Sequence, residues 1–235
     1  MQINKEGIDD TREEIEIIES LIELDGKFLL ELGCGKAQLS RALVSRGKDR
    51  RLVATEVDPI QHAKNLDAAA QENIRFENWG AQKIASEDNT FDVVFMFKSL
   101  HHVPKEMIEQ AFCEIHRVLK RGGVLYISEP IFDGDFNDIL KIFHDEEAVR
   151  LNAFTEICNA IKEGLFSLEA EVFFRLERSY ADFSVFEEQI IGATHTEHQL
   201  SGELLAETKR YFAEKTKKNG GVFWSPIRID LLIKS

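Results

Sequence analysis

The stretch L-L-E-L-G-C-G at residues 29–35 constrains this chain more than any other. An apolar run beginning at Phe28 ends in an acidic residue, and two glycines around one small residue follow before a helical pattern starts near Leu39. This order predicts a buried strand, a tight turn and a helix. Glycine adopts positive φ and lets a ligand approach the main chain, so Gly33 and Gly35 mark a candidate binding turn. The first amides of the following helix would point at the bound group.

Strand and helix patterns alternate after this turn. A strand-rich run ends at Asp58, where Pro59 favours the start of a helix. Further strands are predicted at 74–79, 91–97 and 124–128, with a helix at about 105–120. The segment 91–97 is almost entirely apolar, as is typical of a central parallel strand. Such alternation indicates a parallel sheet with helices on both of its faces.

The two ends of the chain show weaker patterns. An amphipathic helix is predicted at about 11–24, where Thr11 and Glu14 form a capping-box pair. After residue 130 the expected elements are helices at 136–165, a strand at 171–183, a short helix opened by a second capping box, a helix at 202–218 and a strand at 224–233. That second box pairs Ser184 with Glu187. No linker separates a second domain, so 131–168 and 184–220 are expected to decorate one sheet.

Charge and cysteine content limit the partners and the compartment. A formal net charge of -13 repels phosphate backbones and disfavours nucleic acid as a partner. Three cysteines without CxxC spacing favour a reducing compartment, so we expect a cytoplasmic protein. No apolar run approaches the roughly twenty residues that span a bilayer, and the acidic N-terminus is unlike a signal peptide. We therefore expect no membrane association.

Four motifs in this order resemble the class I S-adenosylmethionine-dependent methyltransferases over roughly residues 27–130. The motifs are E-L-G-C-G at 31–35, V-D-P at 57–59, E-D-N-T-F-D-V-V at 87–94 followed by L-H-H-V-P at 100–104, and R-V-L-K-R-G-G-V-L at 117–125. The resemblance implies an α/β, Rossmann-like, doubly wound and mostly parallel seven-stranded sheet whose last strand is antiparallel, with helical lid insertions. It also implies one methyltransferase domain over 1–235. This comprises an N-terminal helical cap at 1–25, a cofactor-binding core at 27–130, and lid helices with C-terminal strands at 131–235.

The implied cofactor is S-adenosylmethionine, with S-adenosylhomocysteine as product. The backbone at Gly33 and Gly35 would admit its amino-acid end, and Glu31 offers a carboxylate near its positive charge. Asp58 is the expected acceptor for the ribose hydroxyls, because period-two alternation places the alternative, Glu56, within the strand. The expected cofactor-binding residues are Glu31, Gly33, Cys34, Gly35, Asp58, Gly80, Ala81, Gln82 and Phe97.

Two departures from the family pattern affect this cofactor site. Lys36 and Ala37 stand where the family usually has threonine or serine and then glycine; Ala37 fits if its φ is negative. Gly80 stands where the family often has an acidic residue that accepts from the adenine amino group. The adenine is then expected to be held by backbone near Ala81 or by Gln82.

Methyl transfer from a sulfonium is an in-line displacement, so an enzyme can gain most of its rate from positioning the two reactants. A base is needed only where the acceptor loses a proton. The candidates for that base are His101 and His102 after the fourth strand and Glu129 after the fifth. Packing or capping of these loops is the alternative role for all three. His195 and His198 are expected to be surface residues, because no third metal ligand lies near them in sequence. No metal site is predicted.

The predicted function is transfer of a methyl group to a small-molecule acceptor. The alternatives are a methyltransferase-like protein that binds the cofactor without turnover, and a protein methyltransferase. A nicotinamide-dependent oxidoreductase is disfavoured, because Gln38 stands where its G-x-G-x-x-G motif has the third glycine. The sequence leaves open the acceptor, the acceptor atom and the oligomeric state.

Overall fold

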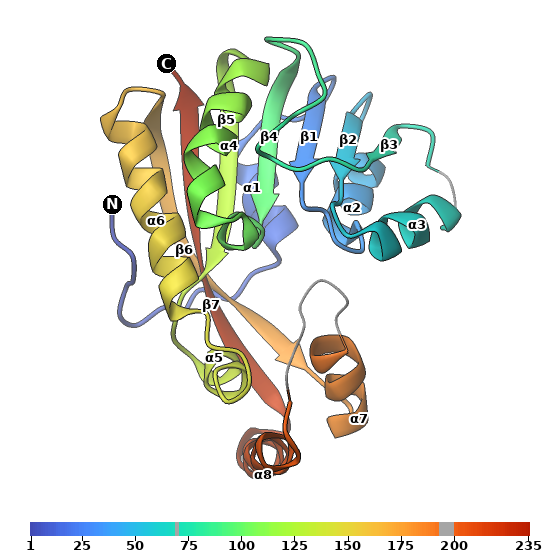
Figure 1. Ribbon diagram of the computed structural model, residues 1–235, viewed down its shortest axis with the longest axis vertical. Coiled ribbons are helices and arrows are strands. Elements are labelled where there is room, and N and C mark those ends of the chain that lie inside the picture. The colour runs from blue at the N-terminus through green and yellow to red at the C-terminus, as the bar shows by residue number, and fades with distance from the viewer. Residues whose placement is uncertain (69–70, 193–199) are drawn as a thin grey trace.

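The computed structural model describes residues 1–68, 71–192 and 200–235, and a seven-stranded sheet forms its centre (Figure 1). The strand order is β3-β2-β1-β4-β5-β7-β6. The strands are β1 (Phe28–Leu32), β2 (Arg51–Thr55), β3 (Ile74–Glu77), β4 (Phe91–Phe97), β5 (Leu119–Pro130), β6 (Phe166–Ser179) and β7 (Val222–Lys234). Pairs among β1 to β5 are parallel, and β7 is antiparallel to both β5 and β6. The expected doubly wound sheet with an antiparallel last strand is confirmed.

Helices cover both faces of this sheet. On one face, α1 (Glu14–Leu21) and α2 (Gln38–Arg46) share an apolar core with β1, β2 and β4. On the other face, α4 (Ile108–Val118) and α6 (Glu147–Lys162) pack against the same strands. The buried face of α4 consists of residues at helical spacing, namely Ile108, Ala111, Phe112, Ile115 and Val118. The remaining helix of this part, α3 (Pro59–Asp67), follows β2 and contacts β3.

A smaller lobe is built on the far ends of β6 and β7. There α5 (Asp135–Leu140), α7 (Phe183–Phe186) and α8 (Gly202–Asn219) lie below the sheet in Figure 1. The helical turn η3 (Glu187–Ile191) continues α7. The lobe has its own apolar cluster, which contains Phe136, Ile139, Leu140, Tyr180, Phe186, Phe212 and Phe223. Two short 3-10 turns, η1 (Leu100–His102) and η2 (Lys105–Met107), precede α4.

The structure corrects several expectations about elements. Thr11 does not cap α1, which starts at Glu14; instead Thr11 bridges to Arg175 of β6. The cap of α7 is Asp182, whose carboxylate accepts from the Val185 amide at 3.0 Å. The expectation that all of 131–168 decorates the sheet is wrong for α6, which forms part of the main core. Among the described residues, no helix is long and apolar enough to cross a membrane.

Candidate functional site

The sheet reverses its winding between β1 and β4. From β1 the chain proceeds outward to β2 and β3, whereas β4 and β5 lie on the other side. In open α/β sheets, ligands bind in the crevice beyond the carboxyl ends of the strands at such a switch point. In Figure 1 these carboxyl ends point towards the lower lobe. The turn after β1 and η1 after β4 therefore flank the expected crevice.

The two glycines of the turn after β1 serve different purposes. Gly33 has φ 74°, and a Cβ on it would lie 2.8 Å from Cβ of Ser99. Ser99 donates its hydroxyl to the carbonyl of Leu32 at 2.7 Å, so the two loops pack tightly there. Gly35 has φ 50°, and no atom lies within 4 Å of where its Cβ would be. Open space for a ligand against the main chain is therefore at Gly35.

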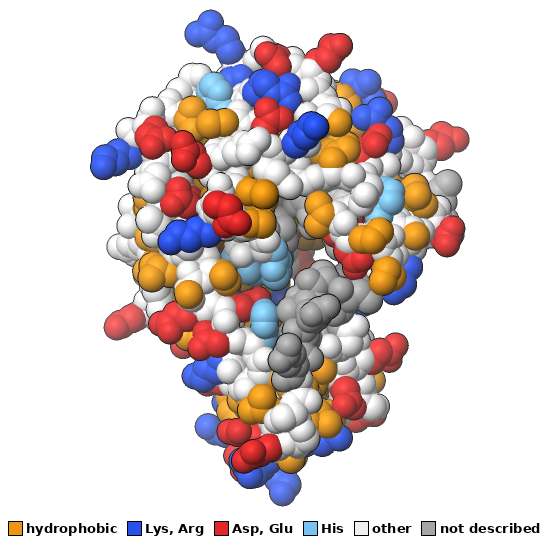
Figure 2. All heavy atoms as spheres, in the orientation of Figure 1, with side chains coloured by type: hydrophobic (Ala, Val, Ile, Leu, Met, Phe, Trp, Pro, Cys, Tyr) orange, Lys and Arg blue, Asp and Glu red, His pale blue; other side chains and the backbone are white. Residues whose placement is uncertain are grey.

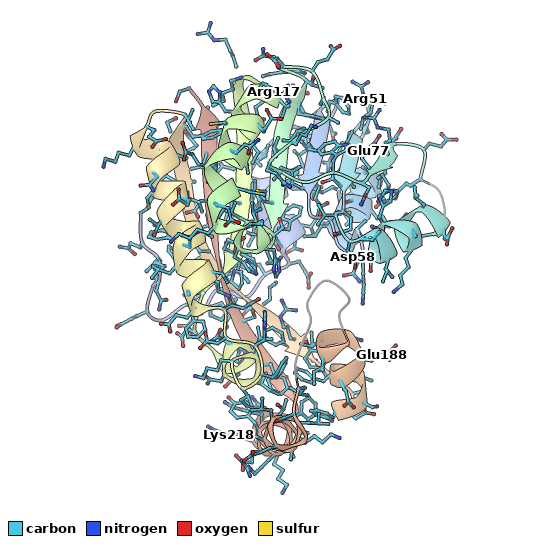
Figure 3. All side chains as sticks on the ribbon, in the orientation of Figure 1. Arg51, Asp58, Glu77, Arg117, Glu188 and Lys218 are labelled. Carbon is cyan, nitrogen blue, oxygen red and sulfur yellow. The ribbon has the colours of Figure 1, made fainter. Side chains whose placement is uncertain are left out.

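Glu56 is the acidic residue that meets this turn. Its Oε2 accepts from the Gly35 amide at 2.8 Å, and its Oε1 accepts from the Asp58 amide at 2.9 Å. β2 ends at Thr55, so the expectation that Glu56 lies within the strand is wrong. Asp58 caps α3 by accepting from the Ile60 amide at 2.9 Å, and Figure 3 shows it at the start of that helix.

A buried acidic group stands behind the turn. Glu31 in β1 is 2% exposed and accepts a hydrogen bond from the Ser40 hydroxyl. Burial raises the pKa of Glu31 to about 8, against that hydrogen bond. Glu14, which α1 inserts beside this strand, pairs with Lys98 after β4. The charges of Glu14 and Glu56 contribute to this rise in the pKa of Glu31, so the site favours an added positive charge.

The remaining expected cofactor residues lie around the same edge. Cys34 donates its amide to the carbonyl of Thr55 at 2.8 Å, and burial raises the pKa of its thiol. Phe97 ends β4 and packs edge-on against Tyr126. In the loop after β3, Ala81 is buried and Gln82 lies against Gly80, where a Cβ would meet Oε1 of Gln82 at 2.5 Å.

Two further observations bear on the cofactor turn. Asn78 donates to the carbonyl of Glu56 at 2.5 Å and so ties the loop after β3 to the Glu56 loop. Ala37 has φ 55°, so the condition under which alanine fits this turn without strain, a negative φ, is not met. Ala37 directly precedes α2, and its backbone has a left-handed conformation that favours glycine.

A carboxylate fixes the histidine turn η1 to β5. Glu129 accepts from the Leu100 amide at 3.0 Å with Oε1, and its Oε2 pairs with Nδ1 of His101. Burial alone would lower the pKa of His101, but Glu129 and Glu146 outweigh it and raise the pKa to about 9. The His101 ring lies 4.1 Å, centroid to centroid, from that of His102, which is exposed.

Residues from before and within α6 complete this cluster. Glu146 lies 3.7 Å, Oε1 to Nε2, from His101, and Nε2 of His144 lies 3.1 Å from the same oxygen. Arg150 donates to the other oxygen of Glu146 at 2.5 Å. Figure 2 shows histidine side chains gathered between the main body and the lower lobe. The cluster lies at the carboxyl edge of the sheet, because η1 follows β4 and Glu129 stands near the end of β5.

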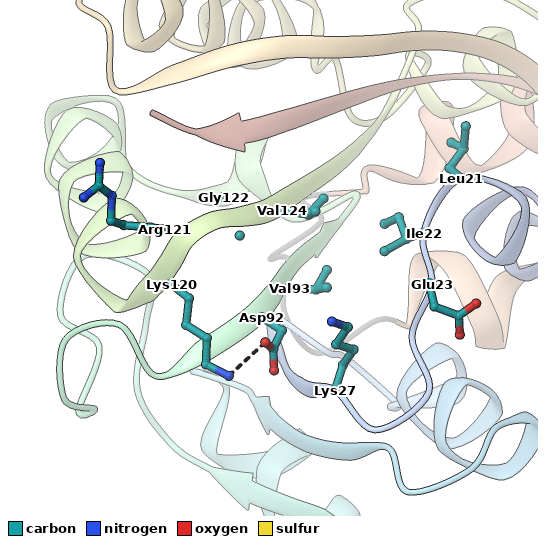
Figure 4. A pocket seen from close by; sticks show the side chains of 11 residues that line it. Leu21, Ile22, Glu23, Lys27, Asp92, Val93, Lys120, Arg121, Gly122 and Val124 are labelled. Carbon is teal, nitrogen blue, oxygen red and sulfur yellow. Dashed lines mark hydrogen bonds and ion pairs between the residues drawn. The ribbon is translucent and has the colours of Figure 1, made fainter.

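Two hollows in the described part of the chain lie elsewhere. One, of about 370 Å³, is at the amino ends of β4 and β5, where Asp92 pairs with Lys120 (Figure 4). The other, of about 230 Å³, lies between Lys5, Gly134 and Trp224. Neither is lined by residues of the turn after β1. We place the site at the switch point because the glycine turn and Glu56 meet there.

Sequence reasoning missed several residues of this edge. Glu14 and Lys98 come from elements distant along the chain. Glu146 and Arg150 have the i,i+4 spacing of a helical ion pair, but no local pattern connects them to His101. The signal that could have favoured Glu56 over Asp58 is the position of this glutamate at the end of a strand, just before an Asp-Pro helix start. His195 and His198 lie outside the described residues.

Comparisons with known proteins agree with this geometry. Residues 30–127 match the family model described as a methyltransferase domain. A ubiquinone biosynthesis O-methyltransferase of Coxiella burnetii is 31% identical over 116 residues, which cover 48% of each protein. The chain thus spans about half the length of the curated relatives that it matches.

Solved structures show the same fold over nearly the whole chain. A proposed methyltransferase from Bacillus halodurans has a TM-score of 0.65 at 16% identity, covering 94% of this chain and 98% of that one. The cyclase SpnF has a TM-score of 0.62 at 19% identity, covering 94% and 80%. Residues 30–127 thus resemble a methyltransferase domain in sequence, and nearly the whole chain shares the fold of solved methyltransferase structures.

Proposed function

We propose that this protein transfers a methyl group from S-adenosylmethionine to a small-molecule acceptor. The observation that carries the proposal is the open backbone at Gly35, tied to Glu56 at the switch point of the sheet. A ligand placed there would meet backbone amides on one side and a carboxylate on the other.

The residues at this edge fit the cofactor's chemical groups. Glu56 is our proposed acceptor for the ribose hydroxyls, in place of Asp58, because its carboxylate lies against the Gly35 turn, whereas that of Asp58 lies at the start of α3. Glu14 and Glu56 supply negative charge that suits an ammonium and a sulfonium. Glu31, which burial keeps protonated near neutral pH, would ionise more readily beside such a cation. The loop of Gly80, Ala81 and Gln82 is the proposed support for the adenine. When bound, the cofactor supplies an electrophilic methyl group.

Several observations support a small acceptor. The Coxiella burnetii relative is named for ubiquinone biosynthesis, which points to a small organic acceptor. The lobe of α5, α7 and α8 lies across the carboxyl edge of the sheet, where a lid would exclude water from the reacting groups (Figure 1). Of the three candidate residues at this edge, His102 is exposed, whereas His101 and Glu129 are buried and hold its turn. Three free cysteines support a cytoplasmic setting.

The two alternatives predict different results. The same fold occurs in a protein named as a cyclase, so the fold alone does not define the reaction. A methyltransferase-like protein without turnover would bind the cofactor and leave every acceptor unmodified. A protein methyltransferase would modify polypeptides, and the net charge of -13 would favour basic ones.

The test combines binding with turnover. Calorimetry should detect S-adenosylhomocysteine binding to wild type and little or none to Gly35→Val, with an unchanged circular dichroism spectrum in both. Labelled S-adenosylmethionine is then offered with hydroxyl, thiol, amine and carbon acceptors, and with basic peptides. Label in a small acceptor supports the proposal. Label only in peptides, or binding without any transfer, would overturn it.

A further inference from the structure

We propose that His101, His102 and Glu146 bind one divalent first-row transition-metal ion at the carboxyl edge of β4 and β5. Each residue offers one ligand atom, and these three atoms all lie within 4.8 Å of one another. The histidines come from η1, and Glu146 immediately precedes α6. Two elements distant along the chain thus bring nitrogen and oxygen ligands together.

The orientation of His101 suits metal binding. Its Nδ1 is engaged by Glu129, so its Nε2 is the atom directed at Glu146. The separation of 3.7 Å between Nε2 and Oε1 of Glu146 exceeds a hydrogen bond. Histidines that bind metals typically donate a hydrogen bond from their other ring nitrogen to a carboxylate, which fixes the tautomer and the orientation of the ring. Glu129 has that position here, and its side chain is 4% exposed.

Glu146 is held just as firmly. Arg150 donates to Oε2 of Glu146, and the same guanidinium donates to Oδ1 of Asn137 at 2.9 Å. The other oxygen, Oε1, therefore faces the histidines. Metal binding would displace a proton from His101. The two carboxylates and one guanidinium would then leave the cluster with a net negative charge, which a dication offsets.

The ligand set indicates the kind of metal. Two imidazole nitrogens and one carboxylate oxygen suit Zn²⁺ and its first-row neighbours, whereas Ca²⁺ and Mg²⁺ prefer oxygen ligands throughout. Three protein ligands leave a coordination position for water or substrate, as in catalytic zinc sites. His144, at 3.1 Å from the same Glu146 oxygen, is a neighbour of the three rather than a member of the set.

This inference rests on the proposed function only for its catalytic consequence. A metal at this edge would bind a hydroxyl of the acceptor and lower its pKa, with the proton released to solvent. The acceptor oxygen would then be an anion at neutral pH. Metal binding itself requires neither cofactor nor acceptor.

The test measures metal binding on the full chain. Protein stripped with a chelator is titrated with ZnCl₂ by calorimetry, and the bound metal is counted by elemental analysis after gel filtration. We expect one equivalent of zinc in wild type, and at least about tenfold weaker binding in His101→Gln, His102→Gln and Glu146→Gln. The matched control is His116→Gln, whose ring lies on α4 against Phe166. Its affinity should equal that of wild type.

His102→Gln is the decisive variant, because His102 is exposed and the two other ligands are buried. Circular dichroism checks that each variant is folded. The visible spectrum of bound Co²⁺ should show coordination in wild type and lose intensity in His102→Gln. Absence of stoichiometric zinc in folded wild type, or wild-type affinity in His102→Gln, would overturn the metal site and leave an ion-pair network that joins η1 to α6. Zinc binding without methyl transfer to any acceptor would instead overturn the proposed function alone.

Discussion

Single residues determine the conformation of the turn after β1, and Ala37 is not the residue type that best fits its own backbone conformation there. Its φ of 55° places a Cβ where an L-residue is strained by roughly 1–2 kcal/mol. Glycine avoids that strain but loses more chain entropy on folding, by about 0.5–1 kcal/mol. We therefore expect Ala37→Gly to raise the free energy of unfolding by about 0.5–1 kcal/mol, measured by urea denaturation.

The control for that change lies in the following helix. Ala42→Gly is in the interior of α2, where glycine should lower stability by about 1 kcal/mol. If both substitutions destabilise the protein equally, the left-handed conformation at Ala37 does not carry a measurable strain.

Glu56 and Asp58 are two residues apart and should behave in opposite ways. Glu56→Gln removes the negative charge of the group that accepts a hydrogen bond from the Gly35 amide. We therefore expect S-adenosylhomocysteine to bind at least about tenfold more weakly. Asp58→Ala removes the cap of α3 and should cost about 1 kcal/mol of stability, with affinity changed less than about threefold. Calorimetry and thermal unfolding measure both effects. The reverse outcome, weak binding in Asp58→Ala alone, would restore Asp58 as the ribose acceptor.

Glu31 makes stability depend on pH in a defined direction. Its pKa is raised to about 8 from an ordinary 4.5, so the folded chain holds a proton that the unfolded chain releases between these values. The native state binds more protons there, and the free energy of unfolding falls as pH rises from 4.5 to 8. Below pH 4.5 this contribution is fully present.

We expect Glu31→Gln to flatten this dependence, because the amide still accepts from Ser40 and carries no charge. Urea denaturation at pH 5 and pH 8 gives the comparison, with the exposed Glu16→Gln as a control for the loss of one charge. An equal decrease between the two pH values in wild type and Glu31→Gln would contradict the buried, protonated state of Glu31.

At the scale of elements, strong periodicity predicted what local sequence can encode. The apolar run at 91–97 is β4 with the same bounds, and the stripe of α4 follows helical spacing. Predictions from weak or competing local signals were wrong where tertiary contacts determine the structure. Thr11 has capping chemistry, but pairing with Arg175 takes it away from α1.

The same physics limited the prediction of the site. Glycines and an acidic strand end indicate a candidate binding turn from local sequence alone, so the position of this turn after β1 was predictable. The choice between Glu56 and Asp58 depends on where β2 ends, which pairing with β1 and β3 determines. The meeting of His101 with Glu146 depends on α6 packing against the sheet, and no spacing in the sequence records it.

At the scale of the whole molecule, the buried apolar side chains of the described residues fall into three clusters. Two lie on opposite faces of the sheet, and the third belongs to the lower lobe. β6 and β7 connect the lobe to the body, because their pairing continues from Arg175↔Pro226 to Ser179↔Val222, beyond the segment where β7 pairs with β5. A separate cluster on a two-stranded extension should open without unfolding the sheet.

Phe186 tests that separation. It is fully buried in the lobe cluster, where its ring packs near Tyr180 and Phe212. Removing such a ring costs about 3–5 kcal/mol where the site cannot collapse. We expect Phe186→Ala to speed amide hydrogen exchange across α7 and α8, while exchange in β1 and β4 and the affinity for S-adenosylhomocysteine stay near wild type. Phe112→Ala, in the main core, should instead speed exchange throughout the sheet. If Phe186→Ala speeds exchange in β1 and β4 as much as in α8, the lobe and the sheet unfold as one cooperative unit.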